Sequence, residues 1–257
     1  MSKLDSFMID FVFPCHEKDI VVLDIAINNI KTFFPNSNIY LISPTDLKIK
    51  NTIQYFDQQF DHLFTLKQIK NKWSSVNEKL SHRSHWIYQQ LLKLHCQNII
   101  FELKNNYVII DADCIFLKPI SFKENIFYYN VANEYHKPYV ATYNKIMKNT
   151  YVPKFSFISH HMIFNKNYVN EMMDTIQKAH NKTFVEVLLD CIDYNENSSF
   201  SEWDLYGNWM ILNHPDVSEH RQLKWLDLPF IPDNNYLKLL SGIYDFVCPH
   251  AWMRGIE

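Results

Sequence analysis

Two aspartates, Asp111 and Asp113, stand where a short apolar run ends. The run, residues 107–110, consists of β-branched and aromatic side chains after two asparagines, which is typical of a buried strand. Carboxylates left unpaired at the edge of an apolar core are costly, so a divalent cation is their natural partner. Residues i and i+2 of a strand point to the same side, and both acids can still reach one ion if the chain turns at Ala112. The alternative is that Asp111 caps a turn and Asp113 is solvated, which is the commoner state of an isolated pair of this spacing.

The composition limits how a phosphate could be bound. Three glycines in 257 residues exclude a glycine-rich phosphate loop, whether of the GxGxxG type or a P-loop. A phosphate must then be held by a metal ion, by side chains or by a helix N-terminus. The formal net charge of −3 argues against nucleic acid as a main partner.

The remaining totals indicate one globular unit in a reducing compartment. A hydrophobic content of 47%, with no repeat and no linker, predicts a single domain over residues 1–257. The five cysteines are scattered and form no CxxC, which suits a reducing environment. The apolar run at residues 7–13 is interrupted by Asp10 and is too short for a signal peptide, and no stretch reaches the length of a membrane span. These features predict a soluble cytoplasmic protein.

The first part of the chain predicts a βαβ unit with short connections, and hence parallel strands joined by a right-handed crossover. Ligands bind at the carboxyl ends of the strands in such sheets. A polar loop that begins at Pro14 follows the first strand, as Asp111 and Asp113 follow theirs, so we expect them at one edge of the sheet. The two strands and the helix of the unit are expected at residues 7–13, 39–42 and 20–34.

Periodicity predicts further elements along the rest of the chain. Residues 67–82 are interpreted as an irregular loop, whose lysines are either solvated or part of a mobile basic lid over phosphates. In a strand at residues 155–164 the adjacent His160 and His161 would point to opposite faces, one toward a cleft and the other toward the core. Gln90 and Lys93, on the helix before the acids, belong either to its solvated face or to the cleft. The other expected elements are strands at 59–66, 126–132 and 225–231, and helices at 84–96, 138–149, 167–179 and 183–192.

Two groups near the end of the chain could also do chemistry. Ser201 and Asp204 have the spacing of a capping box at a helix start, with aspartate in place of the usual glutamate or glutamine. Glu202 is not needed for that cap, and a carboxylate at a helix N-terminus beside aromatic residues is suited to receive a proton from a hydroxyl group. His250 follows a strand-like run at residues 244–248, and its proline and tryptophan neighbours are expected to hold it in place.

In this order, the segments resemble the nucleotide-sugar-dependent glycosyltransferases of the GT-A fold. The nearest likeness is to small bacterial and viral sugar transferases, and a more distant one is to the glycogenin-like families. The most specific segments are residues 88–94, 110–113 and 201–208, and the resemblance covers most of the chain. It implies a Rossmann-like α/β fold with a mostly parallel central sheet flanked by helices and a small C-terminal mixed segment. The donor-binding half would span about residues 1–120 and the acceptor-binding half about 121–257.

The resemblance also implies a set of site residues. Mn²⁺ or Mg²⁺ would bridge the two phosphates of a UDP-sugar, and an imidazole ligand favours Mn²⁺. Asp113 and His250 would bind the ion, and Asp111 would share the ion or contact the donor. The other donor-binding residues implied are Pro14, His16, Lys18, Arg83, Gln90, Lys93 and Ala112.

The acceptor would be a hydroxyl group of a glycan or a similar compound, with contact to a membrane surface if that acceptor is lipid-linked. His160 and His161 would face it. We favour inversion of configuration, with Glu202 or Asp204 as the base, whereas in retaining members of the family these acids would hold the donor sugar. The near absence of glycine leaves the wall of the donor pocket undefined, so the donor sugar is not named.

Two other functions compete with glycosyl transfer. A phosphohydrolase could use the acid pair as nucleophile and general acid, although such pairs normally follow the first strand of the fold. A non-catalytic sugar-binding protein is the third possibility. The presence of all four of Asp111, Asp113, Glu202 and His250 argues against it.

Overall fold

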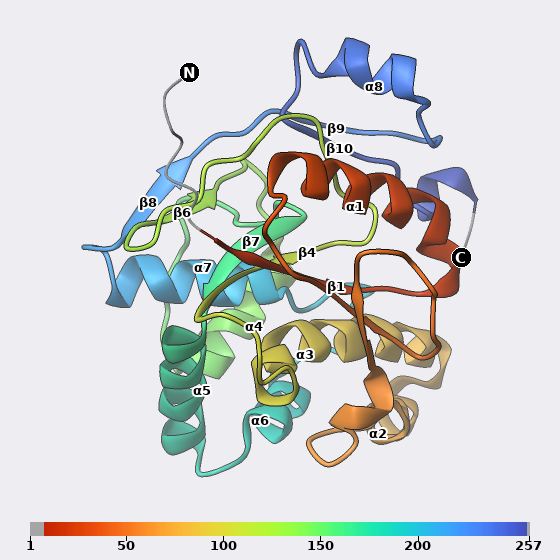
Figure 1. Ribbon diagram of the computed structural model, residues 1–257. Coiled ribbons are helices and arrows are strands. Elements are labelled where there is room, and N and C mark those ends of the chain that lie inside the picture. The colour runs from red at the N-terminus through yellow and green to blue at the C-terminus, as the bar shows by residue number, and fades with distance from the viewer. Residues whose placement is uncertain (1–7, 256–257) are drawn as a thin grey trace.

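The computed structural model describes residues 8–255 (Figure 1). A five-stranded sheet lies at its centre, with the strand order β3-β2-β1-β4-β7. The first four strands run parallel and β7 runs antiparallel to β4. The mostly parallel central sheet that the sequence predicts is therefore confirmed. The strands are β1 (Asp10–Pro14), β2 (Ile39–Ser43), β3 (Ile53–Phe56), β4 (Asn106–Ile110) and β7 (His161–Asn165).

The predicted βαβ unit forms as β1, α1 (Ile20–Phe33) and β2. Leu23, Ile27 and Ile30 lie one turn apart along α1 and are buried against the sheet, which explains why this segment is helical. Of the strand expected at 7–13, residue 7 lies outside the described part of the chain, and β1 begins only at Asp10. All residues of β1 are buried, as in parallel strands that helices cover on both faces.

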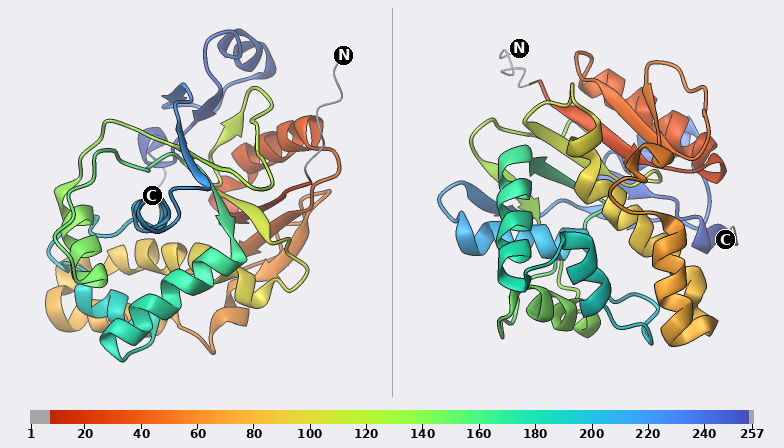
Figure 2. Two further views of the ribbon diagram at one scale, coloured as in Figure 1. Left: turned by 90° about the vertical axis from the view of Figure 1, so that its left-hand side faces the viewer. Right: turned by 90° about the horizontal axis from the view of Figure 1, so that it is seen from below.

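Helices cover both faces of the sheet. In Figure 1, α1 lies on one side of β1 and α3 on the other, and Figure 2 shows α2, α5 and α6 on the same side as α3. α7 packs against α3, α4 and α5. These helices are α2 (Leu66–Asn77), α3 (Ser84–Ile99), α4 (Lys137–Met147), α5 (Lys166–His180), α6 (Phe184–Cys191) and α7 (Glu202–Asn213).

Strands from the C-terminal part of the chain pair with short strands from its middle in two small sheets. In one, β10 pairs antiparallel with β5 and parallel with β9, which confirms the small mixed segment that we expected there. In the other, β6 and β8 are parallel. A short helix, α8, and strand β8 form in segments for which the sequence predicted no element. The bounds are β5 (Ile115–Phe116), β6 (Phe127–Asn130), β8 (Ser218–Arg221), β9 (Trp225–Asp227), α8 (Asn234–Leu240) and β10 (Phe246–Cys248).

The sequence-based assignment of residues 59–82 is wrong. The third strand comes earlier, as β3, and the expected loop is the helix α2 followed by a short 3₁₀ segment. Thr65 begins α2, because its hydroxyl oxygen accepts a hydrogen bond from the backbone N–H of Gln68 at 3.0 Å. Ile69 and Trp73, one turn apart, bury their side chains and hold the helix to the protein. The many polar residues around these two hid the helical period.

The strand expected at residues 155–164 is also shorter than predicted. It begins only at His161, because His160 has a left-handed backbone with φ of 57°. A non-glycine residue in that region is uncommon, and histidine is among the residue types that adopt it most readily. The backbone N–H of Asp111 donates a hydrogen bond to the His160 carbonyl at 2.8 Å. This contact ties the kink to the end of β4.

Within residues 8–255, none of the helices combines the length and the apolar character needed to cross a bilayer.

The first prediction concerns His95, which lies on α3 in the core. Its ring packs against Phe64 and Phe184, at centroid distances of 5.4 and 5.9 Å, and burial lowers its pKa from 6.5 to about 4. Between these pH values the unfolded chain binds a proton at this residue that the folded protein does not, so stability falls as the pH falls. We expect a loss of about 3 kcal/mol on reaching the lower value.

Urea denaturation across this pH range measures the effect. His95→Phe should flatten the pH dependence of the unfolding free energy, whereas His62→Gln, on the exposed surface, should keep the wild-type dependence. An unchanged slope in His95→Phe would contradict the assignment.

Candidate active site

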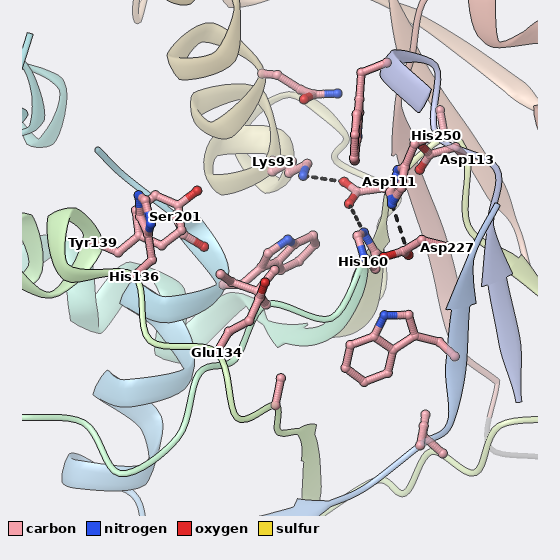
Figure 3. A pocket seen from close by; sticks show the side chains of 18 of the residues that line it. Lys93, Asp111, Asp113, Glu134, His136, Tyr139, His160, Ser201, Asp227 and His250 are labelled. Carbon is pink, nitrogen blue, oxygen red and sulfur yellow. Dashed lines mark hydrogen bonds and ion pairs between the residues drawn. The ribbon is translucent and has the colours of Figure 1, made fainter. Parts of the chain in front are cut away.

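A pocket of about 1180 Å³ opens where the carboxyl ends of β4, β9 and β10 meet (Figure 3). Acids and histidines gather on one wall, and aromatic side chains surround them. The charged and imidazole side chains that line it are Lys18, Asp19, Lys93, Asp111, Asp113, Glu134, His136, His160, Lys224, Asp227 and His250. The aromatic ones are Trp86, Tyr135, Tyr139, Trp203, Trp225 and Trp252.

The two acids of the Asp-Ala-Asp segment sit on a tight turn directly after β4. The backbone N–H of Cys114 donates a hydrogen bond to the carbonyl of Asp111 at 3.0 Å and so closes the turn. The chain thus turns at Ala112, the condition under which both acids could reach one ion. It also places them at the carboxyl edge of the parallel sheet, where ligands of such sheets bind.

Lys93 joins this turn to α7. Its Nζ lies 2.5 Å from Asp111 Oδ1 and 2.5 Å from Glu202 Oε1, and 4.4 Å from the centroid of the Trp203 ring. Only 3% of the Lys93 side chain is exposed. Helix α3 therefore presents one buried cation to a carboxylate on each of two other segments.

In the trio of Lys93, Asp111 and Glu202, two carboxyl groups share one lysine, and their pKa values reflect this. Burial lowers the pKa of Lys93, but the carboxylates of Asp111 and Glu202 outweigh it and raise that pKa. Burial raises the pKa of Asp111, but Lys93 and then His160 outweigh it and lower that pKa. For Glu202 burial dominates over Lys93 and raises the pKa to about 7. Asp111 is thus the ionised partner of Lys93, and Glu202 is poised to hold or release a proton near neutral pH.

His250 connects two further acids, Asp113 and Asp227, beside the trio of Lys93, Asp111 and Glu202. His250 Nδ1 lies 2.8 Å from Asp113 Oδ2, and His250 Nε2 lies 3.1 Å from Asp227 Oδ1. Burial lowers the pKa of His250, yet these two hydrogen bonds outweigh it and raise the pKa to about 10. The hydrogen bond from His250 in turn lowers the pKa of Asp227.

His160 completes the cluster. Its Nδ1 lies 3.3 Å from Asp111 Oδ2, and its ring centroid lies 5.0 Å from that of His250. Three carboxylates and two imidazoles therefore converge beside one lysine. Carboxylate oxygens and imidazole nitrogens are ligands that Mn²⁺ accepts, and the acids outnumber the lysine, so the chemistry of this donor set fits a divalent cation.

Two different groups of residues could hold such an ion. Asp111, Asp113 and His250 form the set that the sequence implies. His160, Asp227 and Cys248 form another, in which one ligand atom from each residue lies within 4.8 Å of the others. For an oxygen-preferring ion we favour the first set, because the Cys248 thiol is fully buried and burial raises its pKa well above the usual range.

The pocket collects about half of the predicted site residues. Lys18, Lys93, Asp111, Ala112, Asp113, His160 and His250 line it, whereas Pro14, His16, Arg83, Gln90, His161, Glu202 and Asp204 do not.

Three of the residues outside the lining have clear alternative surroundings. Gln90 contacts the buried Glu202, behind Lys93. Arg83 donates a hydrogen bond to the carbonyl of Asn197 and lies over the ring of Trp86. His161 is buried, and burial lowers its pKa well below the usual value.

Helix α7 begins as predicted, with Ser201 as its cap. The Ser201 hydroxyl oxygen accepts a hydrogen bond from the Asp204 backbone N–H at 3.3 Å. The Asp204 carboxylate accepts another from the backbone N–H of Phe157 at 2.7 Å, and burial raises its pKa to about 6. A methyl group on Gly207 would lie 2.8 Å from Phe157 Cδ1, so only glycine admits this ring. Asp204 and Gly207 together dock the segment that leads to His160.

Asp227 is the main site residue that the sequence analysis missed. It ends β9, just as Asp111 follows β4, but the strand predicted at residues 225–231 placed it inside the strand, so its position at a strand end was not visible from the sequence. Its place beside His250 depends on the pairing of β9 with β10, which nothing local in the sequence indicates.

Comparisons with known proteins identify a family and several similar folds. A family model described as a family of unknown function, DUF6492, matches residues 8–226. No curated protein matches the sequence. One similar structure is that of the galactosyltransferase LgtC with donor and acceptor sugar analogues. The match covers 93% of this chain and 86% of the LgtC chain, with a TM-score of 0.46 and 9% identity.

Two further structures have comparable scores. An active-site mutant of LgtC has a TM-score of 0.47 and 11% identity, over 93% of this chain and 86% of its own. The apo form of mouse xyloside xylosyltransferase 1 has a TM-score of 0.47 and 12% identity, over 94% of this chain and 97% of its own. Similarities of this degree assign no residue of the site.

The Lys93 network yields the second prediction. Lys93→Met leaves the buried Glu202 and the partly buried Asp111 without their cation, so we expect the unfolding free energy in urea to fall by about 3–5 kcal/mol. Adding Glu202→Gln removes one of these acids and should recover part of the loss. Lys72→Met, at an exposed ion pair with Asp190, should cost less than about 1 kcal/mol. Equal effects at Lys93 and Lys72 would show that the network does not hold the fold together.

Proposed function

We propose that this chain, which belongs to the family of unknown function DUF6492, is a metal-dependent glycosyltransferase. It would transfer a sugar from a UDP-sugar to a hydroxyl group of a glycan-type acceptor. The convergence of Asp111, Asp113, Asp227, His160 and His250 at the carboxyl edge of the sheet carries this proposal. The pocket, at about 1180 Å³, exceeds the roughly 300–1,000 Å³ typical of small-molecule sites and could take donor and acceptor together.

The cation would be held by Asp111, Asp113 and His250. Bound there, Mn²⁺ or Mg²⁺ would neutralise the two phosphates of the donor and the charge on the departing UDP. This role suits a chain that has no glycine-rich loop for phosphates. Asp227 keeps His250 in position through the hydrogen bond to Nε2.

The donor would lie along the end of β1 and the face of α3. Lys18, Lys93 and Ala112 line the pocket and would contact it directly. Lys93 holds Asp111 in place through its ion pair, so it orients the acid as well as supplying positive charge. Pro14 ends β1 and His16 follows it, two residues before Lys18, while Arg83 and Gln90 would act through Trp86 and Glu202.

The acceptor would occupy the aromatic side of the pocket. Flat, amphipathic rings suit sugars, because a ring face packs against the apolar C–H groups while the hydroxyl groups remain free to hydrogen-bond. Tyr135 and Trp252 are 61% and 71% exposed at the pocket and are available for such contacts. His160 would face the acceptor, and His161 would support the site from the core. The division of the chain into a donor half and an acceptor half stays a prediction.

Glu202 and Asp204 remain our candidates for the base of an inverting reaction. With a pKa of about 7, Glu202 matches the requirement for proton transfer near neutral pH. It lies behind Lys93 with 1% of its surface exposed, so the Lys93 side chain would have to move as the substrates bind. Asp204 is held by the Phe157 backbone and is the weaker candidate.

The direct test of the function is release of UDP from a panel of UDP-sugars, with Mn²⁺ and with a chelator. Release that depends on the metal and on an added glycan acceptor supports the proposal. Hydrolysis of a simple phosphate ester without a nucleotide sugar would point to a phosphohydrolase instead. Binding of sugars without turnover, unaffected by the chelator, would point to a binding protein.

The third prediction tests the cation site. Asp113→Asn keeps the size of the side chain but loses its charge, so Mn²⁺-dependent binding of UDP should weaken by more than about 100-fold in calorimetry. Chelation should reduce the wild-type protein to the same level and leave the variant unchanged. Asp190→Asn, at an exposed acid on α6, is the control and should bind UDP normally. An unaltered affinity in Asp113→Asn would refute the metal site.

The fourth prediction concerns Glu202. Glu202→Gln retains a hydrogen-bond acceptor for Lys93 but cannot take a proton, so transfer should fall far more than Mn²⁺-dependent UDP binding. Initial rates of transfer and calorimetry of UDP measure the two quantities. If both fall equally, Glu202 holds the donor site through Lys93 and is not the base.

A further inference from the structure

We propose that His160, Asp227 and Cys248 form a second cation site, which takes a thiophilic ion such as Zn²⁺ and turns off the neighbouring site when it is filled. Filling this site is not a step of the glycosyltransferase reaction proposed above, in which His160 and Asp227 act without a second ion. Only the effect on UDP binding depends on that proposed function.

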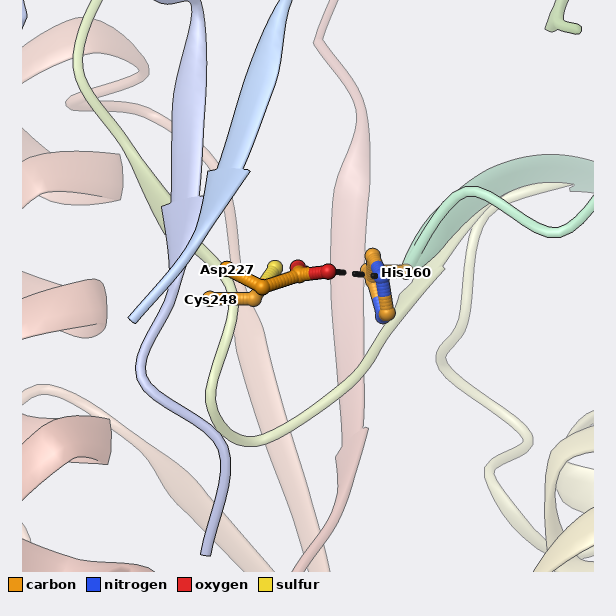
Figure 4. Close-up of side chains that lie close together, drawn as sticks. All are labelled: His160, Asp227 and Cys248. Carbon is orange, nitrogen blue, oxygen red and sulfur yellow. Dashed lines mark ion pairs between the residues drawn. The ribbon is translucent and has the colours of Figure 1, made fainter. Parts of the chain in front are cut away.

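The three side chains come from three segments that meet beside the acid turn. Asp227 ends β9 and Cys248 ends β10, and the two residues are partners in the parallel register, so their side chains leave the sheet at the same level. His160 faces them from the kink before β7 (Figure 4). His160 Nε2 lies 3.9 Å from Asp227 Oδ1, and one ligand atom from each residue lies within 4.8 Å of the others.

These separations are near those of a closed site. With bonds of about 2.0–2.3 Å, the ligands of a tetrahedral zinc lie about 3–4 Å from one another. Side-chain movements of about 1 Å would therefore bring the three ligands to coordinating distance. The fourth position would remain for water, because 45% of the Asp227 side chain is exposed to the pocket.

His160 is already oriented as a zinc ligand is. Its Nδ1 lies 3.3 Å from Asp111 Oδ2, and its Nε2 lies on the other side of the ring, 3.9 Å from Asp227 Oδ1. A carboxylate that accepts a hydrogen bond from one ring nitrogen while the other binds the metal is the usual support of zinc-bound histidine. Asp111 thus serves as the supporting carboxylate.

The ligand type separates this site from the one proposed for Mn²⁺. The set of Asp111, Asp113 and His250 offers oxygen and nitrogen alone, whereas Cys248 adds sulfur, which favours Zn²⁺ or Co²⁺ over Mg²⁺ and Mn²⁺. The two sets share no residue, but Asp227 contacts His250 and His160 contacts Asp111. An ion in the second site would draw Asp227 away from His250 and engage His160 beside Asp111. Occupation of the second site would thereby disturb the first.

Cobalt provides the probe, because Co²⁺ bound to a thiolate gives a charge-transfer absorption that oxygen and nitrogen ligands do not. The full chain, kept reduced, is titrated with Co²⁺ and then with Zn²⁺. We expect the band to appear with Co²⁺ and to vanish as Zn²⁺ displaces it. Cys248→Ser should abolish the band, and Asp227→Asn should weaken Co²⁺ binding by about 10- to 100-fold. Cys191→Ser, remote on α6, and Asp113→Asn should both keep the band.

The proposal is overturned if the wild-type protein shows no Co²⁺–thiolate band, or if Cys248→Ser retains that band. Cys248→Ala repeats the test if the serine variant does not fold, as judged by circular dichroism. Zn²⁺ should also suppress Mn²⁺-dependent UDP binding in the wild type and not in Cys248→Ser, and equal suppression in both would remove the regulatory part. If neither the wild type nor the variant binds UDP, but the Co²⁺ band is present in the wild type and absent in Cys248→Ser, the proposed function fails while the second cation site stands.

Discussion

The buried lysine between two carboxylates is the constraint on which the rest of the site depends. Lys93 reaches Asp111 on the turn after β4 and Glu202 at the start of α7, both at 2.5 Å. It therefore joins the end of the central sheet, α3 and α7 at one point. Removing one member of such a network leaves a buried charge unpaired, which costs far more than losing a surface pair. The position of the Asp-Ala-Asp turn is thus part of the stability of the fold.

Around this point the site carries more negative charge than its lysine can balance. Asp113 and Asp227 share His250, and His160 faces Asp111, so each acid has a hydrogen-bonding partner, and three carboxylates still face a single lysine. The acids lie at the carboxyl edge of the main sheet and at the end of the small mixed sheet. A diphosphate could be bound here only with a cation between it and these carboxylates. That requirement links metal and nucleotide sugar in the proposed function.

Much of this could be predicted from sequence where the signal is local. The β1–α1–β2 unit, α3 and β4 follow from apolar periodicity, and the acid pair from its place after an apolar strand. α2 was missed because Ile69 and Trp73 are its only buried residues and lie among polar ones. The kink at His160 was missed because a hydrogen bond from the Asp111 backbone, 49 positions away in sequence, accompanies it. Asp227 was missed because strand pairing, and not its neighbours in sequence, brings it to His250.

By itself, the sequence determined that the protein has an α/β core with two acids at the end of a buried strand, and that no glycine loop is present to bind phosphate. These properties depend on composition and on short-range periodicity, which a single chain displays directly. Only the tertiary structure decided that the Lys93 ammonium group faces Asp111, and which other side chains surround the two acids. Lys93 and Glu202 are 109 positions apart, and Asp113 and His250 are 137 apart. Contacts over such separations arise from the packing of helices and sheets on one another, which local patterns do not specify.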